Sequence, residues 1–267
     1  MHDAALIRID NATIYRGSTR VFDRFSLLIE QHEQVAILGP NGSGKTTLLK
    51  VLNREIYPVI QDDSSVRILG RDRWNVWELR SHIGIVSHDL QYGYRSTTSG
   101  LDVVLSGYLS SVGMHGSLAA KTGPEQETHA RQVMEQLGVD ALADTALRNM
   151  STGQQRRCLL ARALVHDPDT LILDEPTAGL DLSASFDYLQ RIRDLVASGK
   201  NIVLVTHLLN EIPPDIDRVI LLKAGCIIAD GPKEAVLTEA NLARTYDTDI
   251  RIAAVDGYYL AYPPPPA

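Results

Sequence analysis

Cysteine is scarce in this 267-residue chain, which contains only Cys158 and Cys226. The two lie far apart in the sequence, outside any CxxC motif, and no histidine stands at metal-ligand spacing from either of them. A disulfide framework and a cysteine-based zinc site are therefore not expected. This cysteine usage suits a protein of the reducing cytosol.

Long apolar runs are also missing. Stretches such as 171–173 and 202–205 fall far below the roughly 20 residues that a membrane-spanning helix requires. The N-terminal sequence, MHDAALIRID, does not pair a basic segment with a following apolar one, so no signal peptide is expected. We therefore expect a cytoplasmic protein that lies at the inner face of the cell membrane only through a partner.

The chain also lacks an excess of positive charge. The formal net charge is -7, the isoelectric point is about 5.6, and no run of Lys or Arg is long enough to follow a phosphate backbone. Nucleic acid is therefore not expected as a direct partner. The composition, 44% hydrophobic and 22% charged, is typical of a folded protein with one large domain or a core and a modest subdomain.

Hydrophobic periodicity predicts strands and helices in the first part of the chain. Residues 5–38 are predicted to form antiparallel strands that end in the apolar run 35–38. A glycine-rich loop then leads into helical spacing from residue 48. Residues 92–165 are predicted to be helical, because apolar residues across 130–137 repeat at i, i+3, i+4 and i+7.

The second part of the chain alternates between the two kinds of element. Buried strands are predicted at 171–174 and 202–206, with a helix between them at about 183–197. Strands that alternate with helices predict an α/β fold with a parallel sheet wrapped by helices. Residues 218–230 resemble a hairpin that turns at Ala224-Gly225, and the final PPPPA is expected to be a frayed polyproline tail.

A phosphate-binding loop is the most specific local motif. The sequence GPNGSGKTT matches the pattern G-x-x-x-x-G-K-[ST] between a predicted strand and a predicted helix. Its glycines let backbone N–H groups face phosphate oxygens at the positive end of the helix. Lys45 is expected to reach the β- and γ-phosphates of a nucleotide, and the Thr46 hydroxyl to ligate Mg²⁺; the alternative is a plain glycine turn with an exposed lysine. The predicted nucleotide-binding residues here are Gly39, Pro40, Asn41, Gly42, Ser43, Gly44, Lys45, Thr46 and Thr47.

Two carboxylates, Asp174 and Glu175, follow a predicted buried strand, at the end where open parallel sheets present their ligand sites. Asp174 is expected to support Mg²⁺ through water, and Glu175 to polarise an attacking water as general base. The alternative for a strand-end acidic pair is solvated loop charge. The phosphate loop in the same chain favours the catalytic interpretation.

Three later motifs complete a family pattern. Residues 150–157 are MSTGQQRR, residues 178–181 are AGLD, and Thr206 precedes His207. With the phosphate loop and the LILDEP strand, these elements resemble the ABC ATPase superfamily, in order and spacing and over nearly all of the chain. The resemblance implies a P-loop NTPase cassette that hydrolyses ATP, with a parallel core, an antiparallel β subdomain and a helical subdomain.

The signature segment has two interpretations. By itself, Ser151 followed by Gln154 forms a capping box that opens a helix. In ABC proteins this helix start faces the γ-phosphate held by the other subunit, so the resemblance implies that Ser151, Gly153 and Gln154 bind that nucleotide. Cap and ligand need not exclude each other, because both use the unsatisfied N–H groups of a helix start.

The resemblance implies three further roles. His207 would contact the γ-phosphate and the attacking water, and so join Glu175 and Lys45 in catalysis. Asp181 would face the dimer partner and help couple the two sites, and Tyr15 would stack on adenine. The alternatives are a satisfied surface histidine and, for Tyr15, an aromatic residue of the sheet.

The chain departs from the family pattern at two positions. The family places a magnesium-binding glutamine after a short strand, and here residues 83–91 are IGIVSHDLQ. His88 occupies the aligned position, and Gln91, three residues later, is the predicted Mg²⁺ ligand. Thr152 replaces the usual signature glycine with a β-branched residue, which is compatible with slower turnover and does not imply lost function.

The resemblance also predicts the division of the chain. Residues 1–91 and 166–238 would form the nucleotide-binding core with its antiparallel β subdomain. Residues 92–165 would form the helical signature subdomain. Residues 239–267 would form a C-terminal extension that ends in a disordered Pro-rich tail.

Two functions compete. In the first, an ATP-sandwiched homodimer that uses ATP and Mg²⁺ energises integral-membrane permease subunits, docking around 91–110. Residues 102–108 and the ending from 231 to 262 are similar to cassettes of importers for iron chelates, haem, cobalamin or molybdate, which also use an external solute-binding protein. In the second, the chain is a permease-free ABC ATPase with a regulatory or repair-type role. The single cassette and the acidic charge favour transport.

Overall fold

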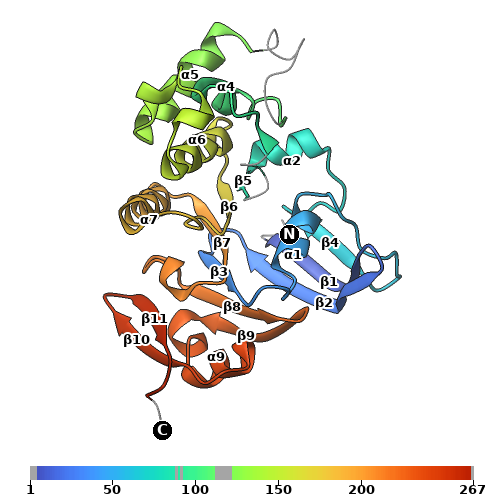
Figure 1. The fold of residues 1–267 in the computed structure, drawn as a ribbon. Coiled ribbons are helices and arrows are strands. Elements are labelled where there is room, and N and C mark those ends of the chain that lie inside the picture. The colour runs from blue at the N-terminus through green and yellow to red at the C-terminus, as the bar shows by residue number, and fades with distance from the viewer. Residues whose placement is uncertain (1–4, 88–89, 91–92, 112–121, 266–267) are drawn as a thin grey trace. The chain divides into compact units, whose positions relative to one another are not determined.

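The computed structural model describes residues 5–87, 90, 93–111 and 122–265 of the chain. The chain divides into two compact units. One is formed by Met1–Val76 together with Asn201–Ala267, and the other by Trp77–Lys200. Figure 1 shows the helices and strands of both.

The first unit opens with an antiparallel sheet of β1 (Ala5–Arg16), β2 (Thr19–Glu30) and β4 (Ser65–Ile68), in the order β2-β1-β4. β1 turns into β2 at Gly17, whose φ of 60° suits a residue without a side chain. The antiparallel strands predicted within 5–38 are confirmed. β4 was not predicted, because its four residues are too few for a periodic signal and, unlike 35–38, they do not form a continuous apolar run.

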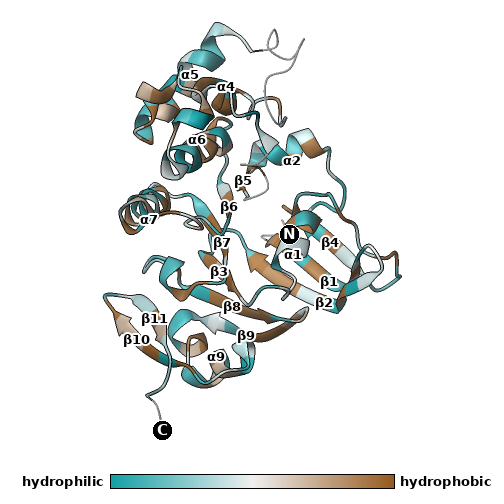
Figure 2. Cartoon of the chain, viewed as in Figure 1, coloured by the Kyte–Doolittle hydropathy of each residue, from teal (hydrophilic) through white to brown (hydrophobic). Residues whose placement is uncertain are grey.

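A parallel group of strands forms the core of the same unit. β3 (Val35–Leu38) lies between β7 (Asn201–Thr206) and β8 (Arg218–Lys223) and runs parallel to both. Every residue of β3 and β7 is buried, as expected for parallel strands covered on both faces. Figure 2 shows the hydrophobic residues of these strands. The predicted strands at 35–38 and 202–206 are therefore confirmed, and α1 (Lys45–Leu52) follows β3 as predicted.

The predicted hairpin at 218–230 is also confirmed. β9 (Cys226–Pro232) pairs antiparallel with β8, and the turn contains Ala224 at φ 46° and Gly225 at φ 76°. A Cβ on Gly225 would lie 2.0 Å from the backbone oxygen of Val21. Only glycine therefore fits at this point of the turn.

The C-terminal part of this unit contains a second hairpin. Its two strands, β10 (Arg251–Val255) and β11 (Tyr258–Tyr262), are joined by a turn at Asp256 and Gly257, which both have positive φ. β11 packs against the short 3-10 turn η4 (Leu209–Glu211). The hairpin was not predicted, because its side chains are mostly exposed or half-buried and lack the alternation of a core strand. The elements of this part are α8 (Lys233–Val236), α9 (Glu239–Tyr246), β10 (Arg251–Val255) and β11 (Tyr258–Tyr262).

The second unit pairs two parallel strands, β5 (Ile83–Val86) and β6 (Thr170–Asp174). The predicted strand at 171–174 and the predicted helix at 183–197 are confirmed. The helical elements described between residues 76 and 197 are α2 (Val76–His82), α4 (Gly100–Leu105), α5 (Pro124–Gln136), η2 (Asp140–Leu142), η3 (Leu147–Asn149), α6 (Thr152–Leu164) and α7 (Leu182–Ala197).

A helical core forms in the second unit where α4 and α5 pack against α6. Ala130, Val133 and Met134 of α5 are buried, which confirms the helical periodicity predicted there. Gly100 and Gly107 border this packing, and a Cβ on either would lie within 2.5 Å of a backbone oxygen. Close backbone approach therefore requires glycine at both positions.

Parallel strands, an antiparallel sheet and helices together confirm the predicted α/β class. The predicted subdomain boundaries at 91/92, 165/166 and 238/239 stay predictions. Across the described ranges, no helix combines the length and the apolar character needed to span a membrane.

Candidate functional site

A glycine-rich loop joins β3 to α1. Gly42 has φ 80° and Gly44 has φ 114°, in the region where side chains are rarely tolerated. A Cβ on Gly44 would lie 2.8 Å from the Phe22 ring, and one on Gly39 would lie 2.1 Å from the carbonyl oxygen of Leu222. The glycine pattern read from the sequence thus has a steric cause in this loop.

The start of α1 has no side-chain cap. Gly44 occupies the N-cap position and makes no side-chain hydrogen bond to the helix. The first N–H groups of a helix have no intrahelical acceptor and carry partial positive charge. This end of α1 can therefore receive an anion.

Lys45 adds a full positive charge at the same place. Its side chain is 6% exposed, and its Nζ donates hydrogen bonds to the carbonyl oxygens of Gly39 at 2.6 Å and Pro40 at 3.1 Å. The Ser43 hydroxyl is buried and has no hydrogen-bond partner within the described part of the chain. A wrapped ammonium, an unsatisfied hydroxyl and an uncapped helix start fit a bound phosphate group.

Backbone hydrogen bonds fix the loop at both ends. The N–H of Gly39 donates to the carbonyl of Thr206 at 3.3 Å, and the N–H of Gly225 donates to the carbonyl of Ser43 at 2.8 Å. The loop is therefore tied to the end of β7 and to the β8–β9 turn. Of the predicted binding residues, Asn41, Gly42 and Thr46 are exposed, whereas Thr47 is buried.

Two more predicted residues belong to the same unit as this loop. His207 directly follows β7 and is half-buried, and its backbone carbonyl accepts a hydrogen bond from the Tyr246 hydroxyl at 3.1 Å. Tyr15 lies near the end of β1 with 43% of its surface exposed, so an adenine ring could reach its face. Adenine stacking on Tyr15 stays a prediction.

The two predicted carboxylates lie in the second unit. Asp174 is the last residue of β6 and is half-buried, and Glu175 follows at φ 45°. A non-glycine residue in this left-handed region is uncommon and recurs at functional sites. The Glu175 carbonyl accepts a hydrogen bond from the N–H of Ala178 at 3.1 Å, which closes a tight turn after the strand.

The capping box predicted in the signature segment is confirmed. The N–H of Gln154 donates to Ser151 Oγ at 3.2 Å, and the N–H of Ser151 donates to Gln154 Oε1 at 2.8 Å. A Cβ on Gly153 would lie 3.1 Å from the Cβ of Ala184, near the start of α7. That start is capped by Asp181, whose Oδ1 accepts the N–H of Ala184 at 2.8 Å. The nucleotide-binding roles of these residues stay predictions.

Arg156 was not predicted to matter, although the structure gives it an unusual position. It is fully buried in α6, its Nη2 donates to the carbonyl of Ala178 at 3.4 Å, and its Nε and Nη1 have no hydrogen-bond partner in the described chain. Arg156 thus links the signature helix to the segment before Asp181. The sequence does contain one indication of this burial, because Arg156 stands three residues before Leu159 and so lies on the apolar face of the predicted helix.

The predicted glutamine-loop residues, Gln91 and His88, lie outside the described residues. Within the residues that are described, no group of three or more His, Cys, Asp or Glu side chains is placed to hold a metal ion.

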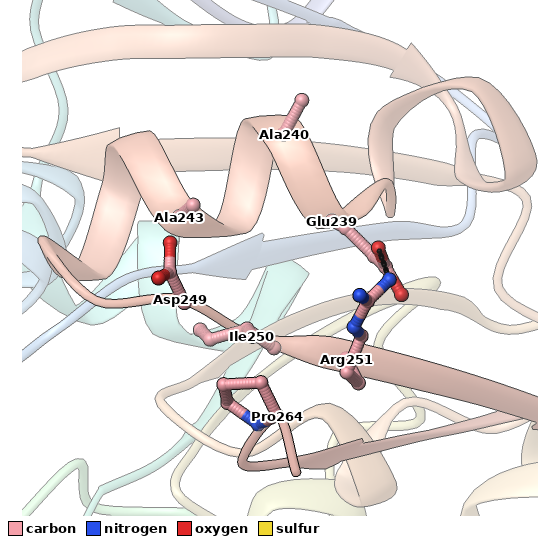
Figure 3. A pocket seen from close by; sticks show the side chains of 7 residues that line it. All are labelled: Glu239, Ala240, Ala243, Asp249, Ile250, Arg251 and Pro264. Atoms are coloured by element: carbon pink, nitrogen blue, oxygen red, sulfur yellow. Dashed lines mark hydrogen bonds and ion pairs between the residues drawn. The ribbon is translucent and has the colours of Figure 1, made fainter. Parts of the chain in front are cut away.

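A pocket of about 390 Å³ lies in the C-terminal part of the first unit. Figure 3 shows that α9 lines one side of it and the segment leading into β10 lines the other. Arg251 and Glu239 form an ion pair of 2.9 Å at its edge. None of the predicted nucleotide-binding residues lines this pocket.

Comparison with known proteins identifies the family. The ABC transporter family matches residues 22–178. An uncharacterised ABC transporter ATP-binding protein of Bacillus subtilis is 32% identical, with 92% of this chain and 93% of that protein covered. A hemin import ATP-binding protein of Rhodopseudomonas palustris is 28% identical, covering 95% and 92%. A Nod factor export ATP-binding protein of Rhizobium johnstonii is 33% identical, covering 87% and 72%.

Solved structures give the same result. An ATP-binding cassette of an ABC transporter in its ADP conformation has a TM-score of 0.75 and 25% identity, covering 91% of this chain and 98% of that one. A dimeric cassette in a post-hydrolysis state with ADP and phosphate has a TM-score of 0.68 and 26% identity, covering 85% and 98%. The chain belongs to the ABC transporter family, as one of its ATP-binding and ATP-hydrolysing cassettes.

Proposed function

We propose that this cassette energises the import of a metal complex or an oxyanion through separate permease subunits, at the inner face of the cell membrane. The observation that carries the proposal is the likeness to the hemin import protein, which extends over 95% of this chain and 92% of that protein. The export relative, in contrast, is matched over only 72% of its length. An external solute-binding protein would deliver the solute to the permease.

Within each subunit, the phosphate loop would hold the β- and γ-phosphates of ATP. The support is the position of Lys45, whose two bonds to loop carbonyls can be exchanged for bonds to phosphate oxygens. Tyr15 would stack on the adenine. Thr46, Asp174 and Gln91 would hold Mg²⁺, which neutralises charge on the phosphate oxygens.

Two residues would act on the attacking water. Glu175 would accept its proton as general base, and its left-handed backbone directly after β6 fixes where the carboxylate leaves the strand. His207 would donate a hydrogen bond to the γ-phosphate and orient the same water. Both act by positioning and charge, which is how phosphoryl transfer is accelerated.

The second subunit would complete the site. Ser151, Gly153 and Gln154 would cover the nucleotide held by the partner, and Asp181 would face the partner subunit. Closure then requires ATP and hydrolysis reverses it, so the closed dimer is a state selected by the nucleotide. We propose the same division of the chain as the sequence predicts, with a core of 1–91 and 166–238, a helical signature subdomain of 92–165 and a 239–267 extension.

A trapping experiment tests the ATPase site. Glu175→Gln keeps the size and hydrogen-bonding capacity of the side chain but removes the base, so ATP should bind without being hydrolysed. We expect the Glu175→Gln protein to elute as a dimer in size-exclusion chromatography with ATP and Mg²⁺, and as a monomer with ADP. A monomer under both conditions would contradict the sandwich.

A second experiment tests the transport role. The tagged protein is captured from detergent-solubilised membranes of its own organism, and its partners are identified by mass spectrometry. A polytopic permease in stoichiometric amount would support the proposal, and uptake assays with that permease would identify the solute. Soluble partners alone, with ATP hydrolysis intact, would favour a permease-free regulatory or repair-type ATPase instead.

A further inference from the structure

The peptide that carries His207 is held from two sides. On one side, the carbonyl of the preceding residue, Thr206, accepts the N–H of Gly39 from the phosphate loop at 3.3 Å. On the other side, the carbonyl of His207 itself accepts the Tyr246 hydroxyl at 3.1 Å. A donor 39 residues away in the sequence thus contacts the backbone of a residue predicted to act on ATP.

Tyr246 is itself firmly placed at the end of α9. Lys223 of β8 donates from Nζ to the carbonyl of Arg244 at 2.6 Å and to Asp247 Oδ1 at 2.5 Å. These bonds satisfy the C-terminal end of α9, where cations are favourable. Asp247 ends the helix in a left-handed conformation at φ 54°. These contacts hold the last turn of α9, and with it Tyr246, in place.

The rest of the C-terminal part supports the same contact. At the start of α9, Thr238 caps the helix. Arg251 of β10 forms an ion pair with Glu239, and Figure 3 shows these two side chains next to each other. β11 packs on η4, which begins two residues after His207. Both ends of α9 and the turn after His207 are thus fixed by residues 223–262.

Hydrogen bonds of the Thr206 side chain also hold the segment after His207. The Thr206 hydroxyl accepts the N–H of Leu208 at 3.0 Å and bonds to the carboxylate of Glu211, which is 1% exposed. Burial raises the pKa of Tyr246 above its ordinary value, so its hydroxyl stays protonated and can donate throughout the physiological pH range. The peptide between His207 and Leu208 is therefore held at its N–H by the Thr206 hydroxyl and at its carbonyl by the neutral Tyr246 hydroxyl.

We propose that Tyr246 is a positioning residue for ATP hydrolysis, which holds the His207 peptide and so aims its imidazole at the γ-phosphate. This inference rests on the proposed role of His207. It assigns a catalytic support function to the C-terminal extension, whose own residues need not touch the nucleotide. A peptide free to rotate would spread the imidazole over several directions, and misplacement of a positioned group lowers the rate of the chemical step.

The test removes only the hydroxyl. Tyr246→Phe keeps the ring and its packing, so we expect kcat for ATP hydrolysis to fall about three- to tenfold, as for one lost net hydrogen bond, with KM for ATP unchanged within about twofold. Tyr262→Phe is the matched control, because Tyr262 lies on β11 and is 49% exposed. It should hydrolyse ATP like the wild type.

A double-mutant cycle separates positioning from general support of the fold. In the His207→Ala background, measured by single turnover with enzyme in excess, Tyr246→Phe should cause no further loss, because the group that it positions is gone. Lys223→Met, which loosens the end of α9 from a different residue, should lower kcat in the same direction and also have no effect without His207. This second variant keeps the test valid if Tyr246→Phe lowers the thermal midpoint strongly.

Three results would overturn the inference, and they are distinguishable. Wild-type kcat in Tyr246→Phe would show that the hydroxyl does not matter. An equal loss in the presence and absence of His207 would assign Tyr246 a purely structural role. Wild-type hydrolysis by His207→Ala would remove the proposed role of His207 itself, and with it the basis of this inference.

Discussion

Each of the two units presents a helix whose N-terminus carries a predicted nucleotide-binding motif, and the two helix starts differ. α1 begins at Gly44, in a left-handed conformation and without a side-chain cap. α6 begins at Ser151, in an extended conformation, with both hydrogen bonds of a capping box. The first leaves its N–H groups to a ligand, whereas the second satisfies two donors with its own side chains.

This difference predicts that the two helix starts differ in how much a bound phosphate gains. A phosphate at α1 gains hydrogen bonds that the loop otherwise lacks. A phosphate at α6 has to exchange with, or share, the bonds of Ser151 and Gln154, so its net gain is smaller. The capped start of α6 (the capped end) therefore fits the proposed contact with a partner's nucleotide, which forms only on closure. The uncapped start of α1 (the open end) fits the proposed binding of nucleotide within one subunit.

The largest effect should come from the open end. Lys45→Ala removes the buried ammonium of the phosphate loop, and we expect ATP hydrolysis to fall by more than about 100-fold, the scale for losing a main charge-stabilising donor. Lys50→Ala, later in the same helix, is the control and should keep near-normal turnover. A steady-state phosphate-release assay measures both. Turnover retained in Lys45→Ala would remove this loop from the site.

The next effect concerns the fold of the open end. Gly44→Ala combines a left-handed backbone with a Cβ 2.8 Å from Phe22, whereas Gly17→Ala has a left-handed backbone and open space. We expect Gly44→Ala to lower the free energy of unfolding by about 1–3 kcal/mol more than Gly17→Ala, the range for overpacking. Urea denaturation measures the difference. Equal losses would mean that the loop has room for a side chain.

Two variants of Ser151 separate its role as a helix cap from its proposed role in binding the partner's nucleotide. Ser151→Ala removes the cap, and we expect a loss of about 1 kcal/mol in unfolding free energy together with reduced hydrolysis. Ser151→Asp keeps a capping oxygen but adds a negative charge opposite the phosphate, so stability should be retained while hydrolysis falls. Thermal unfolding and ATPase assays provide both readouts. Normal hydrolysis in Ser151→Asp would leave Ser151 with the capping role alone.

The smallest effect compares two thiols, one in each unit. Cys158 lies about two turns inside α6, and burial raises the pKa of its thiol to about 12, whereas Cys226 is exposed beside the turn that bonds the phosphate loop. At pH 8, a chromogenic disulfide reagent should react rapidly with one thiol in the folded protein and with two in urea. Cys226→Ser should abolish the rapid reaction, and two rapid thiols in the folded state would contradict the burial.

The same shift sets the sign of a pH effect. The folded thiol of Cys158 stays protonated up to a pKa of about 12, whereas an unperturbed cysteine in the unfolded chain ionises near 9. Its contribution to stability is therefore present below about pH 9 and is lost as the pH rises toward 12. Unfolding measured at pH 8 and pH 10 in Cys158→Ala and in the wild type isolates this contribution.

Local patterns predicted the motifs at both helix starts. The phosphate loop, the capping box, the strand before Glu175 and the Ala224-Gly225 turn each depend on residues a few positions apart, so the sequence displays them directly. The periodicity of α5 is equally local. These features could be predicted because the chemistry that creates them acts over one or two turns of chain.

The contacts that the sequence did not predict join distant segments. The hydroxyl of Tyr246 meets the His207 carbonyl across 39 residues, and Arg156 reaches Ala178 across 22. The β10–β11 hairpin has too little buried alternation to stand out. Such contacts depend on how elements pack against each other, and the sequence pattern of one element does not indicate which other element it will contact.

The hydrogen bonds at Gly39 and Ser43 also have an entropic consequence. Fixing the backbone of one flexible residue costs about 1–2 kcal/mol, and a loop already tied to β7 and to the β8–β9 turn does not incur that loss when a ligand arrives. Binding of a phosphate group at this loop would then require mainly that Lys45 exchange two carbonyl oxygens for phosphate oxygens.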